Sequence, residues 1–323
     1  MTTFLQIDFA ALLAATLAAL SCALVGNFLV LTRRAMVSDA LSHVMLPGVL
    51  VAYLVTGSTA ILPMLTGGVA VALLAVGLVS FLIRTAKVDP SAALGIVFTS
   101  FFAAGVLLME QSGVARTAFD VHHVITGNLE ALVWPGAKGL ASLVTPDDLA
   151  EMPRAIGRLA VILVLVAAIV TALRKELAAI AFDPDFARAS GLPVGTLDLV
   201  LLIATALATV AAFESVGVVL AVAMIVCPPA TARLLTERLG PQIGLSVVVA
   251  VIVVWAGYAI AVLGPPLFGS DLALNAAGTM GAVSGLLFVA AVLYRRWSRV
   301  ANTSPWRGEV APQGAGGGDT RSE

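Results

Sequence analysis

IDFAALLAATLAALSCALVGNFLVL, residues 7–31, is an apolar run in which Asp8 is the single charged residue. A run of this length can cross the hydrocarbon core of a bilayer, which takes about 20 residues of α-helix. It lacks the positively charged start and the short apolar core of a signal peptide. We therefore expect residues 7–31 to remain in the mature protein as a membrane span.

The same pattern recurs along the whole chain. Of its 323 residues, 60% are hydrophobic and 11% are charged, whereas soluble domains carry about 25% charged residues. The sequence therefore predicts an all-α, polytopic membrane protein with about 8–9 transmembrane helices, and 37–56 and 214–221 can be broken or re-entrant. The net charge of −1 gives no indication of a nucleic-acid partner. The expected spans are 7–31, 37–56, 60–83, 91–109, 158–173, 195–213, 216–235, 243–263 and 273–294.

Lysines and arginines follow every second expected span, which predicts the orientation of the chain. On the opposite side, basic residues occur only in or next to one long connection, 111–157. The positive-inside rule then places the N-terminus outside and the C-terminus in the cytoplasm. We expect a transmembrane domain over 1–298, with 111–157 as an external loop, and a disordered cytoplasmic tail over 299–323, which is rich in Gly, Ser and charge.

An acidic residue and a histidine lie close together at the start of the second apolar segment. Asp39 and His43 are four residues apart, so on a helix both side chains point the same way. Pro47 lacks an N–H and cannot bond the carbonyl of His43. A carboxylate, an imidazole and a free carbonyl together suit a divalent cation. The alternative is a structural contact that fixes this span, including an ion pair of Asp39 with Arg34.

Four other polar residues are weaker candidates for a metal site. Glu214 lies between two apolar segments, where a hydrated outer turn and a role in admitting the cation are equally compatible with the sequence. Asp120 and His123 in the external loop can reach one ion at i and i+3. We favour contact with a partner protein, or with water, for this pair. Cys227 precedes two prolines and is more typical of a small buried apolar residue than of a ligand.

A short helix is predicted on the cytoplasmic side, within residues 182–194. Asp183 is a good N-cap and Pro184 suits the first helical position. Gly191 suits the residue after the C-cap. Phe182 and Phe186, at i and i+4, give this helix one aromatic edge that a partner can hold. From these residues alone, a passive loop on the membrane surface is slightly favoured.

Three segments together resemble the permease subunit of bacterial metal-ion ABC importers of the manganese, zinc and iron uptake cluster. The resemblance covers about residues 20–290 in family order. The segments are GNFLVLTRRAMVSDALSHVMLPG (26–48), FDPDFARASGLP (182–193) and AFESVGVVLAVAMIVCPPATAR (212–233).

The resemblance implies a type II ABC importer permease-like bundle in the inner membrane of a bacterium. It implies that Asp39 and His43 line the path of the cation. It also implies a coupling helix that sits in the groove of a cytoplasmic ATPase, with Asp183, Pro184, Phe186, Arg188 and Gly191 as its residues. The implied partners are ATP-binding cassette ATPase subunits, a periplasmic or lipid-anchored metal-binding protein, and a second permease copy or a sister permease. The chain itself would bind no cofactor, because ATP belongs to the partner.

Two rival functions can be compared with this interpretation. An intramembrane metalloprotease would carry H-E-x-x-H, but Val-Met-Leu follows His43, and there is no G-x-S-x-G or G-x-x-x-x-G-K-[ST] motif in the chain. We therefore expect no enzyme activity. A stand-alone ion-coupled metal transporter would leave the short cytoplasmic helix without a role. The harder ligands at Asp39 and His43 favour manganese, with zinc or iron as alternatives.

Overall fold

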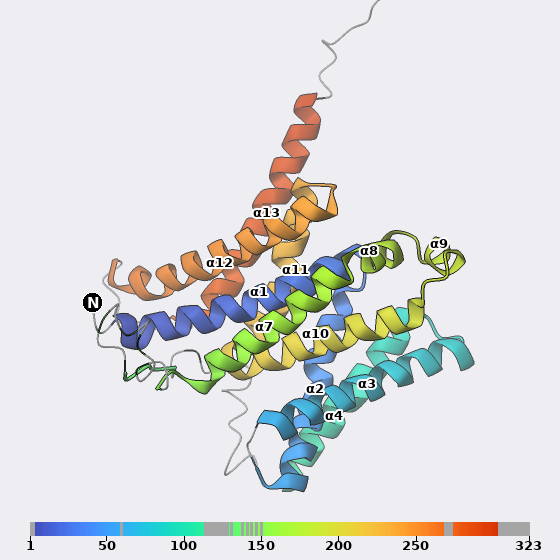
Figure 1. The fold of residues 1–323 in the computed structure, drawn as a ribbon, viewed down its shortest axis with the longest axis horizontal. Helices are drawn as coiled ribbons and strands as arrows, with labels where there is room; N and C mark the ends of the chain where they lie inside the picture. Colours follow the sequence, from blue (N-terminus) through green and yellow to red (C-terminus); the bar gives the residue numbers. More distant parts are fainter. Residues whose placement is uncertain are drawn as a thin grey trace, which may run out of the picture.

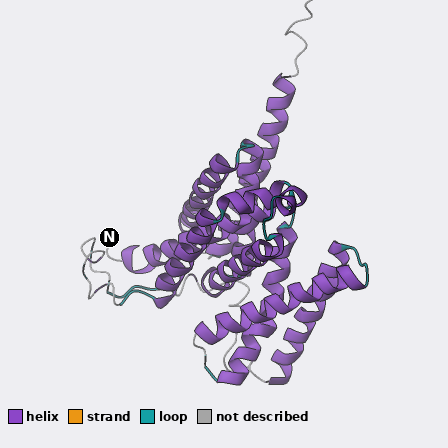
Figure 2. Cartoon of the chain, turned by 45° about the vertical axis from the view of Figure 1, so that its right-hand side comes forward, coloured by secondary structure: helices purple, strands orange, loops and turns teal. Residues whose placement is uncertain are grey.

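Every regular element that the structure describes is a helix (Figure 2). The structure is a computed structural model that describes residues 4–58, 61–112, 129, 132–136, 139, 142, 145, 148, 151–267 and 274–302. The predicted all-α class is confirmed. The elements are η1 (Phe4–Asp8, a π-helix), α1 (Phe9–Leu31), α2 (Ala35–Thr56), α3 (Ile61–Thr85), α4 (Pro90–Ser112), α7 (Arg154–Ala172), α8 (Arg174–Phe182), α9 (Pro184–Ala189), α10 (Val194–Val216), α11 (Val218–Leu235), α12 (Leu239–Leu267) and α13 (Ala276–Asn302).

Eight helices in the described part of the chain are long and apolar enough to cross a membrane. The prediction of about eight or nine transmembrane helices is thus confirmed. The second expected span is the 22-residue helix α2, in which the apolar stretch of described residues covers His43–Thr56. In Figure 1, α2 runs steeply across the direction of α1 and α10.

The helices form two groups (Figures 1 and 2). In the larger group, α1 packs against α7, α10, α11 and α12, while α13 covers α11 and α12. In the smaller group, α2 packs against α3 and α4, and α10 is its main neighbour in the larger group. Lipid tails are as apolar as the helices, so packing in a membrane depends on close contact between small residues. The buried face of α1 fits this rule, since it includes Ala10, Ala11, Ala14, Ala15, Ala18, Ala19, Ala23 and Gly26.

A buried polar network joins α1 to α12. Asn27 Nδ2 donates to the Ala23 carbonyl and to Ser246 Oγ, both at 2.7 Å, and Gln242 Nε2 donates to Asn27 Oδ1 at 3.1 Å. All three side chains of this network are fully buried. Buried amides without partners would cost several kcal/mol in a membrane, so these bonds fix the two helices relative to each other.

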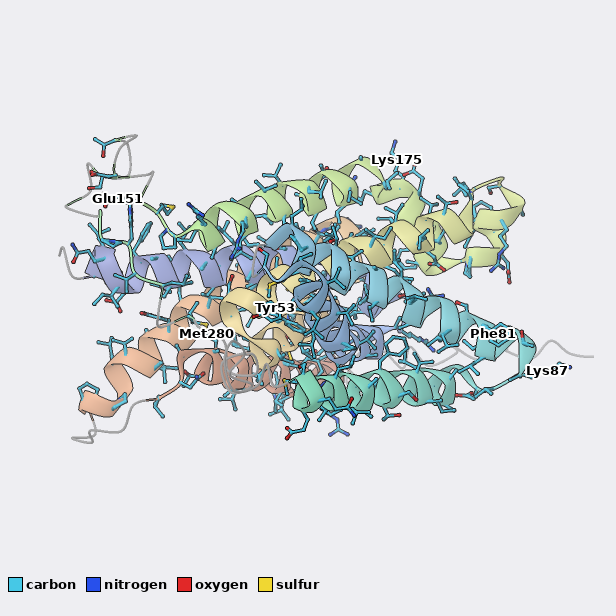
Figure 3. The ribbon with its side chains drawn as sticks, turned by 90° about the horizontal axis from the view of Figure 1, so that it is seen from below. Tyr53, Phe81, Lys87, Glu151, Lys175 and Met280 are labelled. Atoms are coloured by element: carbon cyan, nitrogen blue, oxygen red, sulfur yellow. The ribbon has the colours of Figure 1, made fainter. Side chains whose placement is uncertain are left out.

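The two ends of the bundle carry different connections. Lys87 and Lys175 lie toward one end, and Glu151 lies at the opposite end (Figure 3). At the Glu151 end, the fully buried Trp134 is bonded at both of its N–H groups. Its backbone N–H donates to the Gln6 carbonyl at 2.7 Å, and its Nε1–H donates to the Asp148 carbonyl at 2.8 Å. Trp134 therefore ties the long connection to η1, directly before α1.

Candidate functional site

The candidate cation residues occupy the first half of α2, which includes both Asp39 and His43. The helix continues through Pro47 to Thr56. Because proline has no N–H, Pro47 cannot donate the hydrogen bond that another residue at this position would give to the His43 carbonyl. A Cβ on Gly48 would lie 2.5 Å from the Gly67 carbonyl oxygen, so α2 and α3 are in backbone contact directly after this proline.

Two aromatic rings of α4 contact the half-buried His43. The imidazole centroid lies 4.8 Å from that of Phe98 at an interplanar angle of 71°, and 5.3 Å from that of Phe102 at 89°. Both contacts are edge-to-face, the geometry that aromatic pairs prefer. The phenylalanines therefore restrict the orientation of the imidazole. The sequence offered one signal for them, their i and i+4 spacing on one helix.

Four other candidate ligands lie wholly or partly outside the described residues. The side chains of Asp39 and Glu214, and the whole of Asp120 and His123, lie outside the described residues. The backbone places Glu214 in the last turn of α10 rather than in a separate turn between two helices. Within the described part of the chain, no group of three or more His, Cys, Asp or Glu side chains could hold a metal. Of the candidate ligands Asp39, His43, Glu214, Asp120 and His123, His43 alone has a described side chain, and Cys227, the less typical candidate, is half-buried on α11.

Arg34, the alternative partner for Asp39, forms an ion pair with another helix. Its Nη1 lies 3.2 Å from Asp198 Oδ2 on α10. This long-range pair was absent from the sequence predictions, because nothing in the local pattern connects residues so far apart. Asp198 is thus an acidic partner of Arg34 that lies outside α2.

The short helix predicted within residues 182–194 is present as α9, and the structure shows its predicted caps. The Asp183 side chain accepts hydrogen bonds from the N–H groups of Asp185 at 3.1 Å and Phe186 at 2.9 Å, and Pro184 is the first helical residue. At the other end, Gly191 has a φ of 80°, and its N–H donates to the Arg188 carbonyl at 3.0 Å. These bonds satisfy backbone groups that a six-residue helix would otherwise leave open.

One face of α9 is anchored, and exposed aromatic rings lie on α9 and at the end of α8. Ala187 is fully buried, whereas the Phe182 and Phe186 residues are 57% and 65% exposed. The Arg233 guanidinium lies 6.0 Å from the Phe182 ring centroid, which connects this segment to the end of α11. Arg188 is paired with Asp185 on the helix itself. In Figure 1, α9 lies at one end of the molecule, away from α2.

The helix α8 was missed by the sequence analysis. It fills the space between the fifth apolar segment and α9, and its Leu177 and Ile180 side chains are buried. Those two residues are three positions apart, which is the signal that could have predicted it. The two short helices are separated by the extended Asp183; α8 packs against α7 and α10, and α9 packs against α8 and α10 (Figure 1).

Comparisons with known proteins agree with this architecture. The ABC 3 transport family matches residues 4–136 and 139–295. The chain is 37% identical over 278 residues to the manganese transport system membrane protein MntD of Bacillus subtilis, covering 86% of this chain and 88% of that protein. It is 33% identical over 303 residues to the manganese transport system membrane protein MntC of Halalkalibacterium halodurans, covering 94% and 92%.

A solved structure has the same fold. PsaBC from Streptococcus pneumoniae in complex with Fab superimposes with a TM-score of 0.72 at 24% identity, and the match covers 90% of this chain and 94% of that chain. Eight span-length helices and membrane-protein relatives identify a multi-pass membrane protein of bacterial type. Because the family matches nearly the whole chain, this protein belongs to the ABC 3 transport family, as its three sequence motifs indicated.

Proposed function

We propose that this chain is the membrane-spanning permease subunit of an ATP-driven importer of divalent transition-metal ions, with Mn²⁺ as the favoured substrate. The observation that carries the proposal is the half-buried imidazole of His43, one turn after Asp39 and one turn before Pro47 on α2. Ionisable groups within membrane segments are costly and usually line a path or a site. The names of the two relatives, which both specify manganese transport, support the choice of metal.

The proposed site is a transit site and needs few ligands. Asp39, His43 and the His43 carbonyl supply oxygen and nitrogen donors, which suit Mn²⁺ and also accept Zn²⁺ or Fe²⁺. A transit site must release its ion, so an incomplete set of ligands is favourable. A second permease copy or a sister permease would contribute the remaining ligands. Glu214, Asp120 and His123 are proposed to act earlier, where the cation is admitted.

Energy would come from partner subunits through α9. We assign Asp183, Pro184, Phe186, Arg188 and Gly191 to the coupling helix, because its caps make a very short helix rigid and the exposed Phe186 ring projects from it. ATP-binding cassette ATPase subunits would hold this helix and hydrolyse ATP. A periplasmic or lipid-anchored metal-binding protein would deliver the cation at the external loop 111–157. The C-terminal tail, 299–323, would then lie in the cytoplasm.

Reconstitution tests the function against its main alternative, a stand-alone ion-coupled transporter. The purified permease is placed in liposomes with or without the ATPase subunits, and uptake of radioactive Mn²⁺ is followed with internal or external ATP. We expect uptake only with the ATPase subunits and ATP on their side of the membrane. Uptake driven by an ion gradient without these subunits would refute the proposal. Zn²⁺ or Fe²⁺ is then added to the same vesicles, and the extent to which each lowers Mn²⁺ uptake ranks the preference of the transporter for these metals.

A single substitution tests the site. A metal–imidazole contact is at least as strong as a charge-assisted hydrogen bond, about 1.5–3 kcal/mol, so His43→Ala should lower Mn²⁺ uptake by at least about tenfold. Thr56→Ala, an exposed change at the far end of the same helix, is the matched control. Size-exclusion chromatography with the ATPase subunits checks assembly. Normal uptake by an assembled His43→Ala transporter would remove His43 from the path.

A further inference from the structure

The turn between α1 and α2 has a defined geometry. The Arg34 N–H donates to the Leu29 carbonyl at 2.8 Å, and the Arg33 N–H donates to the Val30 carbonyl at 3.2 Å. This pair of bonds is a Schellman motif, which normally places glycine where Arg33 lies. Arg33 adopts the left-handed conformation, with a φ of 57°. The direction in which α2 leaves α1, and the position of Arg34, are therefore set by the backbone.

From this turn Arg34 reaches the helix that follows the coupling helix. Its partner Asp198 lies close to the start of α10, and Leu192 and Pro193 alone separate Gly191 from that helix. The connection is tight, because the Val194 N–H donates to the Leu192 carbonyl at 2.9 Å. A displacement of α9 must therefore move Asp198, which holds the beginning of α2 through the Arg34 guanidinium.

A second contact between the same helices lies deeper in the membrane. Met45, two residues after His43, packs with Ala206 and Val210 of α10 and with Ala72 of α3. Such an apolar contact can slide with little loss, since dispersion forces have no preferred direction. The ion pair differs, because the guanidinium and carboxylate attract each other across a fixed distance of 3.2 Å. When α10 moves along its axis, the ion pair should therefore displace the start of α2 more than the apolar contact does.

We infer that Arg34 and Asp198 are positioning residues that transmit the movement of α9 to the cation-binding helix α2. The inference rests on the proposed function, because it assumes that α9 is moved by an ATPase. The two side chains are 51% and 29% exposed. Ion pairs with this much exposure contribute little to folding stability. Breaking the pair should consequently leave the protein folded and uncouple ATP hydrolysis from transport.

The test compares metal uptake with ATP hydrolysis in the complete reconstituted transporter. The neutral variant Asp198→Asn keeps the shape of its side chain and removes the charge, and Arg34→Gln removes the charge and shortens the side chain. The charge-reversed variants Arg34→Asp and Asp198→Arg are made singly and together. We expect each single variant to lower the number of Mn²⁺ ions imported per ATP by about fivefold or more, the effect typical of coupled neighbours. The double reversal should restore the ratio to within about twofold.

One variant serves as a control, and two results would contradict the inference. Arg296→Gln removes an exposed arginine from α13 and should leave the ratio unchanged. Unchanged ratios in the single variants would overturn the inference. Equal impairment in the singles and in the double reversal would overturn it too, because the residues would then matter separately.

A readout without metal separates this inference from the proposed function. In a Cys22→Ser, Cys227→Ser background, Thr56→Cys reports the movement of α2 through its ATP-dependent labelling by a maleimide. Asp198→Asn should abolish the ATP-dependent change in labelling. If ATP changes labelling in the parent but no metal is imported, the proposed substrate is wrong while the Arg34–Asp198 link is still measured. ATP-dependent labelling that persists in Asp198→Asn would refute the link.

Discussion

A methyl group added at Gly257 should destabilise the packing of α12 against α13. An ideal Cβ at this buried glycine would lie 2.5 Å from the Met280 Cα, 2.8 Å from its Cγ and 3.0 Å from its backbone nitrogen. Met280, labelled in Figure 3, is itself fully buried. Reaching ordinary contact at 3.4 Å requires the two backbones to separate by about 0.9 Å, the difference from 2.5 Å. Rotation of a side chain cannot relieve this overlap, because one of the atoms is Cα.

The expected change in the free energy of unfolding is the sum of two opposing effects, the cost of overpacking and the stability gained by replacing glycine. A gap of about 0.5–1 Å loses a quarter to a half of the dispersion energy between neighbouring atoms. Overpacking costs about 1–3 kcal/mol, and backbone overlap favours the upper end of that range. Replacing glycine by alanine within a helix restores about 0.5–1 kcal/mol through the lower entropy of the unfolded chain. The net expectation for Gly257→Ala is a loss of about 2 kcal/mol in the free energy of unfolding.

Unfolding by SDS in mixed micelles, followed by tryptophan fluorescence, measures this loss. Gly244→Ala is the matched control, because it lies on the same helix and a Cβ there meets no described heavy atom within 4 Å. The control should gain about 0.5–1 kcal/mol. In the double variant Gly257→Ala, Met280→Ala the Cγ overlap disappears and the Cα overlap remains, so stability should not recover. A Gly257→Ala protein as stable as the control would refute the packing argument.

Three further predictions concern turns and caps. Arg33→Gly should raise the free energy of unfolding by about 1 kcal/mol in the same assay, because glycine adopts the left-handed conformation without strain; a fall in stability would contradict this. Asp183→Ala should remove the cap of α9, worth about 1 kcal/mol, and weaken binding of the ATPase subunits about fivefold, whereas Asp183→Asn should not. Trp134→Phe should leave the Asp148 carbonyl without its indole donor, at a cost of about 1–3 kcal/mol. The Trp→Phe change should speed hydrogen exchange of the residue-134 amide by about fivefold or more, and unchanged exchange would show that the indole bond contributes nothing.

The sequence predicted the helices well because apolar runs are a direct physical signal. Each of the nine expected segments corresponds to one helix. Their ends were less predictable, as α13 shows: residues 273–294 were expected, whereas the helix covers Ala276–Asn302. Hydropathy marks where a segment leaves the membrane, but backbone hydrogen bonding continues into the polar residues beyond. Similarly, α10 extends to Val216, and Gly217 with a φ of 83° ends it.

The caps of α9 were predictable for a different reason. Asp183, Pro184 and Gly191 act on backbone groups within a few residues, so their positions in the sequence determine their roles. Contacts between distant helices have no such local rule. The ring contacts of His43 with Phe98 and the bond from Asn27 to Ser246 depend on how helices pack, and they became visible only in three dimensions.

The types of contact in the two helix groups indicate which parts can move relative to each other. In the larger group, buried hydrogen bonds such as Asn27 to Ser246 would be lost if α1 and α12 separated. Within the smaller group, the close backbones of Gly48 and Gly67 bind α2 to α3. Between the groups, α2 contacts α10 through apolar residues and the partly exposed Arg34–Asp198 pair. Since apolar contacts slide at low cost and buried polar bonds do not break cheaply, we expect the proposed transport cycle to shift α2 and α3 together relative to α1.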